Sequence, residues 1–430
     1  MKSNRKAVFF LTLTIGVCTL LLVSPSTITV ASSADARNSQ PVADASTSSG
    51  RSFEQVARLA ASRKRTAFFG GAVAISGDTA VVGALGFVNP HGRSIQGFAY
   101  VFVKPATGWA NMTETAQLRA SDGGDKATNA FGNSVAIDGN TIIVGAVNGE
   151  VYVYVKPATG WVDMTETAKL QNGGRGADCF ACAVGISDDT VVVGAPGLFH
   201  PFAPGKAYVF VKPAGGWQTT STPNAILTPT DKVPGGQFGG AVAIDRDTIA
   251  VLAPHAFSTT DPSGAYVYVK PSGGWQSATE TAKLSDSHGV KTQFFGLCIA
   301  GNTVVAGGFT GGPPGVADVF VKPASGWANA FESASLTGGN TFDDFGDSVS
   351  LNGKGLMVGA PAANQIQGAA YLFVEPAGGW KSTSKFSAVF TSLGGRTDDL
   401  FGLALGLQDK TVLIGAPNAH RTGLAYIFEP

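Results

Sequence analysis

This chain of 430 residues has no net charge and few methionines. Its 30 lysines and arginines are balanced by 30 aspartates and glutamates, so the formal net charge at pH 7 is zero. This balance excludes the strong positive field that draws proteins to nucleic acid or to anionic membranes. Only four methionines stand against 57 glycines. With frequent Val, Thr, Phe and Ala, the composition favours many short strands joined by tight turns.

Cysteine is equally rare, with four in the whole chain. Cys18 lies in an N-terminal apolar run, which leaves an odd number, Cys179, Cys182 and Cys298, and no rich disulfide framework. Cys179 and Cys182 have redox or metal spacing, but neither a helix start nor four ligands accompany them. On a strand, their Cα atoms would lie about 10 Å apart, too far for a disulfide without a bulge. We expect buried thiols, with a disulfide as the alternative.

Long apolar segments are absent except near the N-terminus. Three basic residues open the chain: Lys2, Arg5 and Lys6. An apolar run from Ala7 to Val23 and an Ala-x-Ala site at Ala34–Ala36 follow, as is typical of a secretory signal. We predict a signal peptide at residues 1–36, with an uncleaved anchor as the alternative, and a flexible linker at 37–52. We expect no membrane insertion of the mature chain.

A repeated unit makes up the rest of the sequence. Seven phenylalanines begin FG-like elements: Phe69, Phe131, Phe180, Phe238, Phe295, Phe345 and Phe401. Their spacings range from 49 residues (Phe131 to Phe180) to 62 residues (Phe69 to Phe131). Each unit contains four strand-like segments, typified by "FGGAVAI", "TVVVGA", "AYVFVK" and "ETAKL". Variable spacing indicates loops of different length on one scaffold.

The segments have the character of fully covered strands. Two residues that tolerate positive φ, such as Gly77-Asp78, join the first two segments, which predicts a hairpin. In the third segment, Tyr100 and Phe102 point one way and Val101 and Val103 the other, so both faces of the sheet are apolar. Radially stacked blades cover both faces without helices. We therefore predict an all-β, seven-bladed propeller of four-stranded antiparallel blades over residues 53–430.

The ends of the repeat array predict how the ring closes. The last unit stops at "AYIFEP", a third strand, whereas Phe53–Ser62 resembles the fourth-strand segments. We expect the N-terminal strand to complete the seventh blade, which leaves few exposed edges.

The FG elements carry a family resemblance. Together with "VGAP" at Val193–Pro196 and Val358–Pro361 and "IGAP" at Ile414–Pro417, they resemble the FG-GAP repeats of integrin α-subunit-like seven-bladed propellers. The resemblance covers roughly residues 53–430. It implies a module exposed outside the cytoplasm and used mostly for recognition, often in adhesion.

The chain departs from the family in its calcium loops. Several integrin-type blades carry a D-x-D-x-D-G loop between the first two strands, because calcium needs six to eight oxygens. Here only short turns such as Asp188-Asp189 and Asp245–Asp247 stand there, too short to wrap an ion. We expect no metal and no cofactor.

Three residue types recur at fixed places, and we interpret them as scaffold. Glycines for close packing near the propeller axis are Gly70, Gly132, Gly239 and Gly346. Residues before the prolines are Lys104, Lys156, Lys212, Lys270 and Lys322, with Glu375 and Glu429. The tryptophans are Trp109, Trp161, Trp217, Trp275, Trp327 and Trp380. The alternatives are a positive ring that binds an anionic partner and aromatic rings that stack on sugars.

The connections after strands two and four should lie on one face, and the short turns on the other. The first set contains the longest and least repeated segments, "GFVNPHGRSIQ", "GLFHPFAPGK" and "HAFSTTDPSG". Variable loops on a rigid scaffold are where binding usually occurs. The candidate ligand-face residues are His91, His200, Phe202, His255, Asp261, His288, His420 and Arg421.

No catalytic constellation stands out in the sequence. Asp343-Asp344 and Asp398-Asp399 are neighbours whose side chains should diverge, and no Ser-His-Asp or H-E-x-x-H pattern appears. We predict a secreted or cell-surface propeller without enzyme activity that binds an extracellular protein or glycan, in adhesion or envelope recognition. The alternatives are a secreted carbohydrate-active hydrolase or lyase and a purely structural envelope protein.

Overall fold

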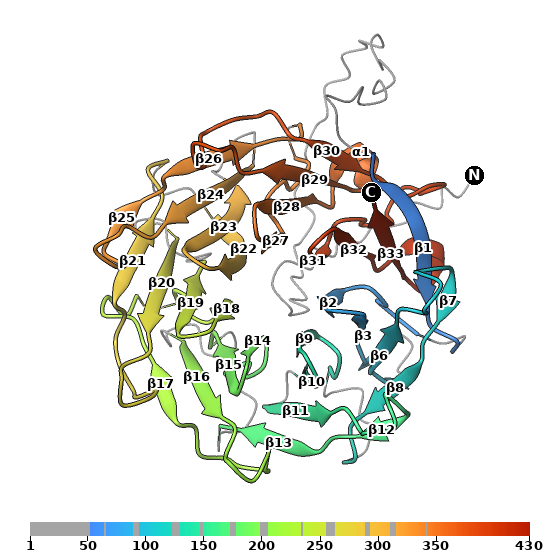
Figure 1. Cartoon of the computed structure of the whole chain (residues 1–430), viewed down its shortest axis with the longest axis horizontal. Coiled ribbons are helices and arrows are strands. Elements are labelled where there is room, and N and C mark those ends of the chain that lie inside the picture. Colours follow the sequence, from blue (N-terminus) through green and yellow to red (C-terminus); the bar gives the residue numbers. More distant parts are fainter. Residues whose placement is uncertain are drawn as a thin grey trace, which may run out of the picture.

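The structure is a computed structural model with seven sheets arranged radially around one axis (Figure 1). It describes residues 52–63, 66–88, 94–122, 130–146, 149–172, 178–197, 205–233, 235–254, 263–288, 293–309, 315–340 and 342–430. The predicted signal segment, and the predicted linker apart from Ser52, lie outside these ranges. The sheets confirm the predicted all-β, seven-bladed propeller of mostly antiparallel strands.

Each blade is built from four strands, the first of which lies innermost (Figure 1). Blades 1 and 2 comprise β2 (Ala72–Ser76), β3 (Thr79–Ala84), β6 (Phe98–Val103) and β8 (Ala116–Arg119), then β9 (Ser134–Asp138), β10 (Thr141–Ala146), β11 (Glu150–Val155) and β13 (Ala168–Gln171). Blades 3 and 4 comprise β14 (Ala183–Ser187), β15 (Thr190–Ala195), β16 (Lys206–Val211) and β17 (Ala225–Leu227), then β18 (Ala241–Asp245), β19 (Thr248–Ala253), β20 (Gly264–Val269) and β21 (Ala282–Ser285).

Blades 5 to 7 repeat this plan. They comprise β22 (Gln293–Ala300), β23 (Thr303–Phe309), β24 (Val316–Val321) and β26 (Ala334–Thr337), then β27 (Val349–Asn352), β28 (Gly355–Ala360), β29 (Ala369–Val374) and β30 (Ala388–Phe390), then β31 (Ala404–Gln408), β32 (Thr411–Ala416), β33 (Leu424–Glu429) and β1 (Glu54–Ala60). Short elements in the connections are β4 (Phe87–Val88), β5 (Ser94–Ile95), β7 (Met112–Thr113), β12 (Met164–Thr165), β25 (Ala330–Phe331), the helical turn α1 (Ala363–Ile366) and the 3₁₀ turn η2 (Ala419–Arg421).

The first two strands of every blade are joined by the predicted two-residue turn. In blade 1, for example, Ser76 pairs with Thr79 and leaves only Gly77 and Asp78 in the turn. The first turn residue has a φ between 51° and 58° in all seven blades, at Gly77, Gly139, Asp188, Arg246, Gly301, Gly353 and Asp409. Glycine, aspartate and asparagine tolerate this conformation, which explains their frequency in these turns.

The apolar core is divided among the seven interfaces between blades. Each buried cluster joins side chains of two successive blades, as where Val101 of blade 1 packs with Tyr152 of blade 2. The six tryptophans belong to six of these clusters and are at most 8 % exposed: Trp109, Trp161, Trp217, Trp275, Trp327 and Trp380. Their interpretation as packing residues is confirmed.

The FG glycines pack against the preceding blade. Gly239 has a φ of +95°, and a Cβ there would lie 2.4 Å from the Lys206 carbonyl oxygen. A Cβ on Gly194, in the GAP element of blade 3, would lie 2.1 Å from the Gly239 carbonyl oxygen. The predicted packing role is confirmed, and the close contact is made between blades.

The fifth copy of the FG element differs from the prediction. Strand β22 has a bulge between Phe294 and Gly296, and Phe294 is fully buried whereas Phe295 is only partly buried. Phe294 therefore holds the buried position of this element, although the sequence repeat places Phe295 at its start. Leu252 of the preceding blade occupies the place of the GAP glycine and packs with Phe294 in one cluster.

The prediction of free thiols at Cys179 and Cys182 is wrong, because the structure joins them in a disulfide. The segment forms a turn before β14, with positive φ at Cys179 and Ala181, and the Cys182 amide donates to the Cys179 carbonyl at 3.1 Å. The turn brings the two Cα atoms to 5.6 Å, which is within disulfide range. Cys298 is free, and burial raises the pKa of its thiol.

The predicted ring closure is confirmed by strand β1. It pairs antiparallel with β33, from Leu59 opposite Ala425 to Glu54 opposite Glu429. The ring of Phe53 lies 5.4 Å from that of Phe390 in blade 6. Residues from the two ends of the described fold therefore form one blade.

Candidate functional site

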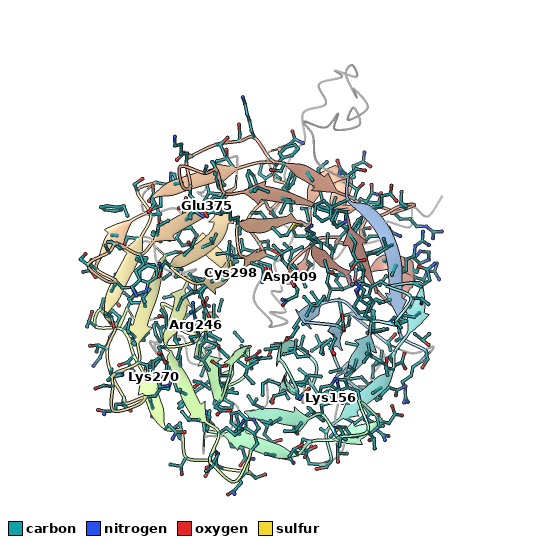
Figure 2. The ribbon with its side chains drawn as sticks, in the orientation of Figure 1. Lys156, Arg246, Lys270, Cys298, Glu375 and Asp409 are labelled. Atoms are coloured by element: carbon teal, nitrogen blue, oxygen red, sulfur yellow. A yellow bond between two sulfur atoms is a disulfide. The ribbon has the colours of Figure 1, made fainter. Side chains whose placement is uncertain are left out.

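The short turns define one face of the propeller, which we call the hairpin face. Three of its five repeated lysines pair with carboxylates: Lys104 with Glu429 at 2.8 Å, Lys270 with Asp247 at 3.2 Å, and Lys212 with Asp189. Figure 2 shows Lys156, Lys270 and Glu375 around the ring, with Arg246 and Asp409 nearer the axis. The pairing supports the scaffold interpretation of these lysines over an anion-binding ring.

The hairpin face is also joined from blade to blade near the axis. The last side chain of one inner strand accepts a hydrogen bond from the first turn amide of the next blade, as Ser76 does from Gly139 at 3.1 Å. The same bond is made by Asp138 with Asp188, Ser187 with Arg246, Asp245 with Gly301, and Asn352 with Asp409. These polar groups are thereby used within the scaffold.

The connections after strands two and four form the opposite side, which we call the loop face. Five of the candidate residues predicted there, His91, His200, Phe202, His255 and Asp261, lie outside the described residues. The structure does place His288, His420 and Arg421 in connections of this set.

His420 and Arg421 lie on the turn η2 between β32 and β33. Both residues are exposed, and both have a positive φ, 52° at His420 and 69° at Arg421. Backbone bonds fix the turn, including one from the Gly423 amide to the Ala419 carbonyl at 2.8 Å. These two residues belong to blade 7, whereas His288 lies between blades 4 and 5, so the structure does not bring the three together.

His288 joins two polar residues that sequence reasoning missed. Its Nε2 lies 2.9 Å from Ser335 Oγ and 3.3 Å from Asp318 Oδ1. The Ser335 hydroxyl also donates a hydrogen bond to Asp318. The Asp318 side chain is fully buried, and burial raises its pKa to about 6, against the opposing effects of the Ser335 hydrogen bond and of the His288 charge. A partly buried serine, a partly exposed histidine and a buried acid thus meet between two blades.

This group does not have the geometry of a catalytic triad. In a triad the serine and the aspartate contact different imidazole nitrogens, and the serine proton passes to the histidine. Here Ser335 and Asp318 both contact Nε2, and the serine hydroxyl donates to the carboxylate. The arrangement suits the fixing of polar groups more than nucleophilic attack.

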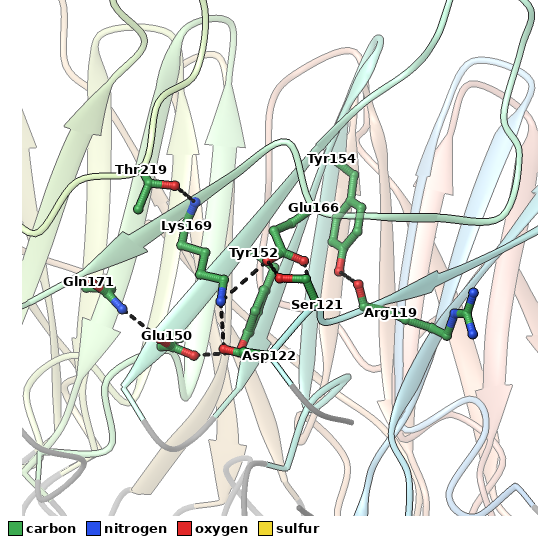
Figure 3. A network of polar contacts seen from close by, with 10 residues as sticks. All are labelled: Arg119, Ser121, Asp122, Glu150, Tyr152, Tyr154, Glu166, Lys169, Gln171 and Thr219. Carbon is green, nitrogen blue, oxygen red and sulfur yellow. Dashed lines mark hydrogen bonds and ion pairs between the residues drawn. The ribbon is translucent and has the colours of Figure 1, made fainter. Parts of the chain in front are cut away.

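Two other interfaces place a different trio at the same register. At the first, Lys169 Nζ lies 2.7 Å from Asp122 Oδ2 and 5.5 Å from the centre of the Tyr152 ring (Figure 3). The Tyr152 hydroxyl lies 2.6 Å from Glu150 Oε2 and 3.1 Å from Asp122 Oδ2. Between blades 3 and 4, Lys283, Asp231 and Tyr266 repeat the trio, with a 2.7 Å bond from the Tyr266 hydroxyl to Asp231.

The electrostatics of these trios differ from those of the His288 group. Burial acts to raise the pKa of Asp122, but hydrogen bonds from Lys169 and Tyr152 outweigh it and hold the pKa below its usual value. Burial acts to lower the pKa of Lys169, and the hydrogen bond and charge of Asp122 reverse this. Both groups stay ionised at neutral pH and form a fixed salt bridge.

A signal for the His288 group is present in the repeats. Aligning "GFAYVFVKP" with "VADVFVKP" shows Asp318 in the place of tyrosine, and aligning "TAKL" with "SASL" shows Ser335 in the place of lysine. His288 follows Leu284 by four residues, as Asp122 follows Leu118. The group was missed because its members come from three segments of two blades.

Comparison with known proteins agrees with the architecture. The fold is a β-propeller, a scaffold used generally for binding and adhesion. The FG-GAP repeat family model matches residues 53–102, 112–154, 164–210 and 334–373. The chain therefore contains FG-GAP repeats at these four places.

No curated protein matches the chain. Among solved structures, the chain is similar to the crystal structure of the computationally designed Ika8 protein, with 15% sequence identity and a TM-score of 0.48 over 87% of this chain and 99% of that chain.

Proposed function

We propose that the protein is an exported recognition module that binds an extracellular protein or a glycan through its loop face, in adhesion or in recognition at the cell envelope. The supporting observation is the difference between the two faces. The hairpin face repeats almost identically, and its polar groups bond within and between blades. The loop-face segments differ from blade to blade in length and composition. Variable loops on a rigid ring suit the recognition of one partner.

The proposal also concerns export, calcium and catalysis. Export is suggested by the N-terminal pattern of residues 1–36, and FG-GAP domains are typically extracellular. Within the described ranges, no helix has the length and apolarity to cross a bilayer. We propose that binding needs no calcium at the seven hairpins, because a two-residue turn cannot gather six oxygens around the ion. We also propose that the module binds without catalysis.

The test is a binding screen of the mature chain against a glycan array and a panel of extracellular proteins. In a first variant, the connections between the second and third strands of blades 1, 3 and 4 are each replaced by the short connection of blade 2, residues 147–149. A second variant carries His420→Ala and Arg421→Ala. The matched control is Lys156→Ala with Glu375→Ala on the hairpin face. We expect a hit that the loop variants weaken at least tenfold and the control preserves. Loss of binding in the control alone would contradict the proposal.

A further inference from the structure

One register of the third strand carries an acid in blade 5 alone. The other six blades have a tyrosine there: Tyr100, Tyr152, Tyr208, Tyr266, Tyr371 and Tyr426. Blade 5 has Asp318, and its partner in the fourth strand is Ser335. Blades 2 and 4 have a lysine at the register of Ser335, namely Lys169 and Lys283. Blade 5 thus has an additional carboxylate and no lysine beside it.

The interfaces before blades 2 and 4 show what an ammonium group does at this register. Lys169 Nζ lies 2.7 Å from Asp122 Oδ2 and 3.4 Å from Glu166 Oε1 (Figure 3). Lys283 pairs in the same way with Asp231. The two lysine side chains are 18% and 28% exposed, so both lie where the interface meets solvent. The register therefore accommodates a cation between acids at a position in contact with solvent.

The interface between blades 4 and 5 keeps the acids of this arrangement. Glu332 holds the place of Glu166, since the carboxylate of each accepts hydrogen bonds from the amide and hydroxyl of a serine in the preceding blade. Burial and, to a smaller extent, the charge of Glu332 raise the pKa of Asp318. In the described part of the chain, His288 is the one basic side chain paired with Asp318, and it is a cation only when protonated. Negative charge therefore exceeds positive charge here.

One carboxylate oxygen of Asp318 has no partner among the described residues. Its Oδ1 contacts Ser335 and His288, whereas its Oδ2 is buried and makes no hydrogen bond with them. A buried carboxylate oxygen without a hydrogen bond is unfavourable. Ser335 is shorter than lysine and only partly buried, and the His288 side chain is 29% exposed. The place that an ammonium group fills at the two other interfaces thus borders solvent here as well.

We propose that this place is a binding site for a lysine side chain of the partner protein, whose ammonium group takes the position that Lys169 and Lys283 provide at the two other interfaces. Asp318 and Glu332 supply the negative charge, and a charge-assisted contact offsets the cost of the buried carboxylate. The site lies toward the loop face, because His288 belongs to a connection of that face. The inference rests on the proposed function and identifies the partner as a protein.

The probe is the lysine derivative Nα-acetyl-lysine N-methylamide, and its neutral match carries a second acetyl group on Nε. Each is titrated into the full chain at neutral pH and followed by NMR through the imidazole signals of His288, which a His288→Gln variant assigns. We expect saturable shifts with the lysine derivative and none with its neutral match. Asp318→Asn should weaken binding about tenfold, because it removes a charged contact. The control Asp78→Asn removes an equal charge on the hairpin face and should bind like the parent.

A second variant tests the site without any probe. Ser335→Lys supplies the ammonium group from the chain itself, as Lys169 does in blade 2. We expect it to abolish the saturable shifts and to melt about 1–2 °C higher than Ser335→Met, a variant of similar length without the charge.

Four results would overturn the proposal. The first is no saturable shift with the lysine derivative. The second is equal binding by the neutral match or by Asp318→Asn. The third is a Ser335→Lys variant that melts no higher than Ser335→Met. The fourth is tighter binding of the probe by Lys291→Gln, which would assign the place to a lysine of this chain that lies outside the described residues.

The lysine site and the proposed function can fail separately. Probe binding that depends on Asp318, without any hit in the binding screen, would contradict the proposed function and support the lysine site. A partner that binds through the loop face with equal affinity for the parent and for Ser335→Lys would contradict the lysine site and support the proposed function.

Discussion

At the residue scale, the buried Asp318 makes stability depend on pH. Its folded-state pKa of about 6 lies above the usual 3.8, so between these values the folded chain binds more protons than the unfolded chain. The stability contribution of this group therefore falls as pH rises from about 4 to above 6. We expect Asp318→Asn to remove this loss. When the pH is raised from 4 to 8, the free energy of unfolding of the variant should therefore rise relative to that of the parent by on the order of 1–3 kcal/mol. Urea denaturation at both pH values measures it, and parallel pH profiles would contradict it.

Two glycines with the same backbone conformation allow the energetic cost of a positive φ to be measured separately from the cost of a close contact. Gly239 has a φ of +95° and touches blade 3, whereas Gly274 has a φ of +91° and would place a Cβ in open space. We expect Gly274→Ala to cost about 1 kcal/mol, the penalty of positive φ alone. Gly239→Ala should cost at least about 2 kcal/mol more, because its Cβ meets the Lys206 carbonyl. Equal losses of unfolding free energy for the two variants, measured by urea denaturation, would show that the two blades shift to accommodate the added Cβ.

The limits of sequence reasoning are also visible at this scale. The core phenylalanines and tryptophans were predictable because seven copies repeat them in one register. The disulfide was not, because Cys179 and Cys182 were assigned to a strand although the FG element begins with a turn. Phe295 was preferred over Phe294 because the letters FG, rather than the bulge in β22, were matched.

At the scale of the elements, outer strands of neighbouring blades are joined by a recurring contact. The Ser62 amide and hydroxyl both donate to the Glu114 carboxylate, at 2.8 and 2.6 Å. The same contact joins Ser121 to Glu166, Thr230 to Glu280, and Ser287 to Glu332. The glutamates of "ETA" and "ESA" at four of the seven fourth strands thus have a structural cause that the sequence alone did not reveal.

We expect Ser62→Ala and Glu114→Ala each to destabilise the ring by about 1 kcal/mol, since each removes a charge-assisted hydrogen bond at a partly exposed site. The double variant should cost clearly less than the sum, because both changes remove the same contact. A double-mutant cycle by urea denaturation measures the coupling. Strict additivity would show that the contact contributes nothing.

The candidate site was predictable from the sequence only in part. Unequal loop lengths identified the loop face, because they contrast with strands that repeat. The group of His288, Asp318 and Ser335 depends on contact between two blades, which only the register of the third and fourth strands reveals.

At the scale of the whole molecule, the closing strand β1 should control stability. It pairs with β33 over Glu54–Leu59 and contributes Ala57 and Leu59 to the core between blades 7 and 1. Deletion of residues 53–62 exposes that cluster, so we expect the melting temperature to fall by more than about 10 °C or cooperative melting to disappear. Calorimetry measures this change. The control is removal of residues 1–52, which leaves β1 in place and should melt like the full chain; similar melting of both truncations would refute the closure.

The division of the core among seven interfaces has a kinetic consequence. No blade holds a complete apolar cluster of its own, so an incomplete chain always carries two uncovered blade faces. The last cluster forms only when Glu54 meets Glu429, a separation of 375 residues (429 − 54). Contacts of such long range are slow to form, and partly folded chains with exposed apolar surface tend to aggregate. Full burial of the apolar interfaces therefore requires the synthesis of β33, and we expect faster closure to raise the yield of folded protein.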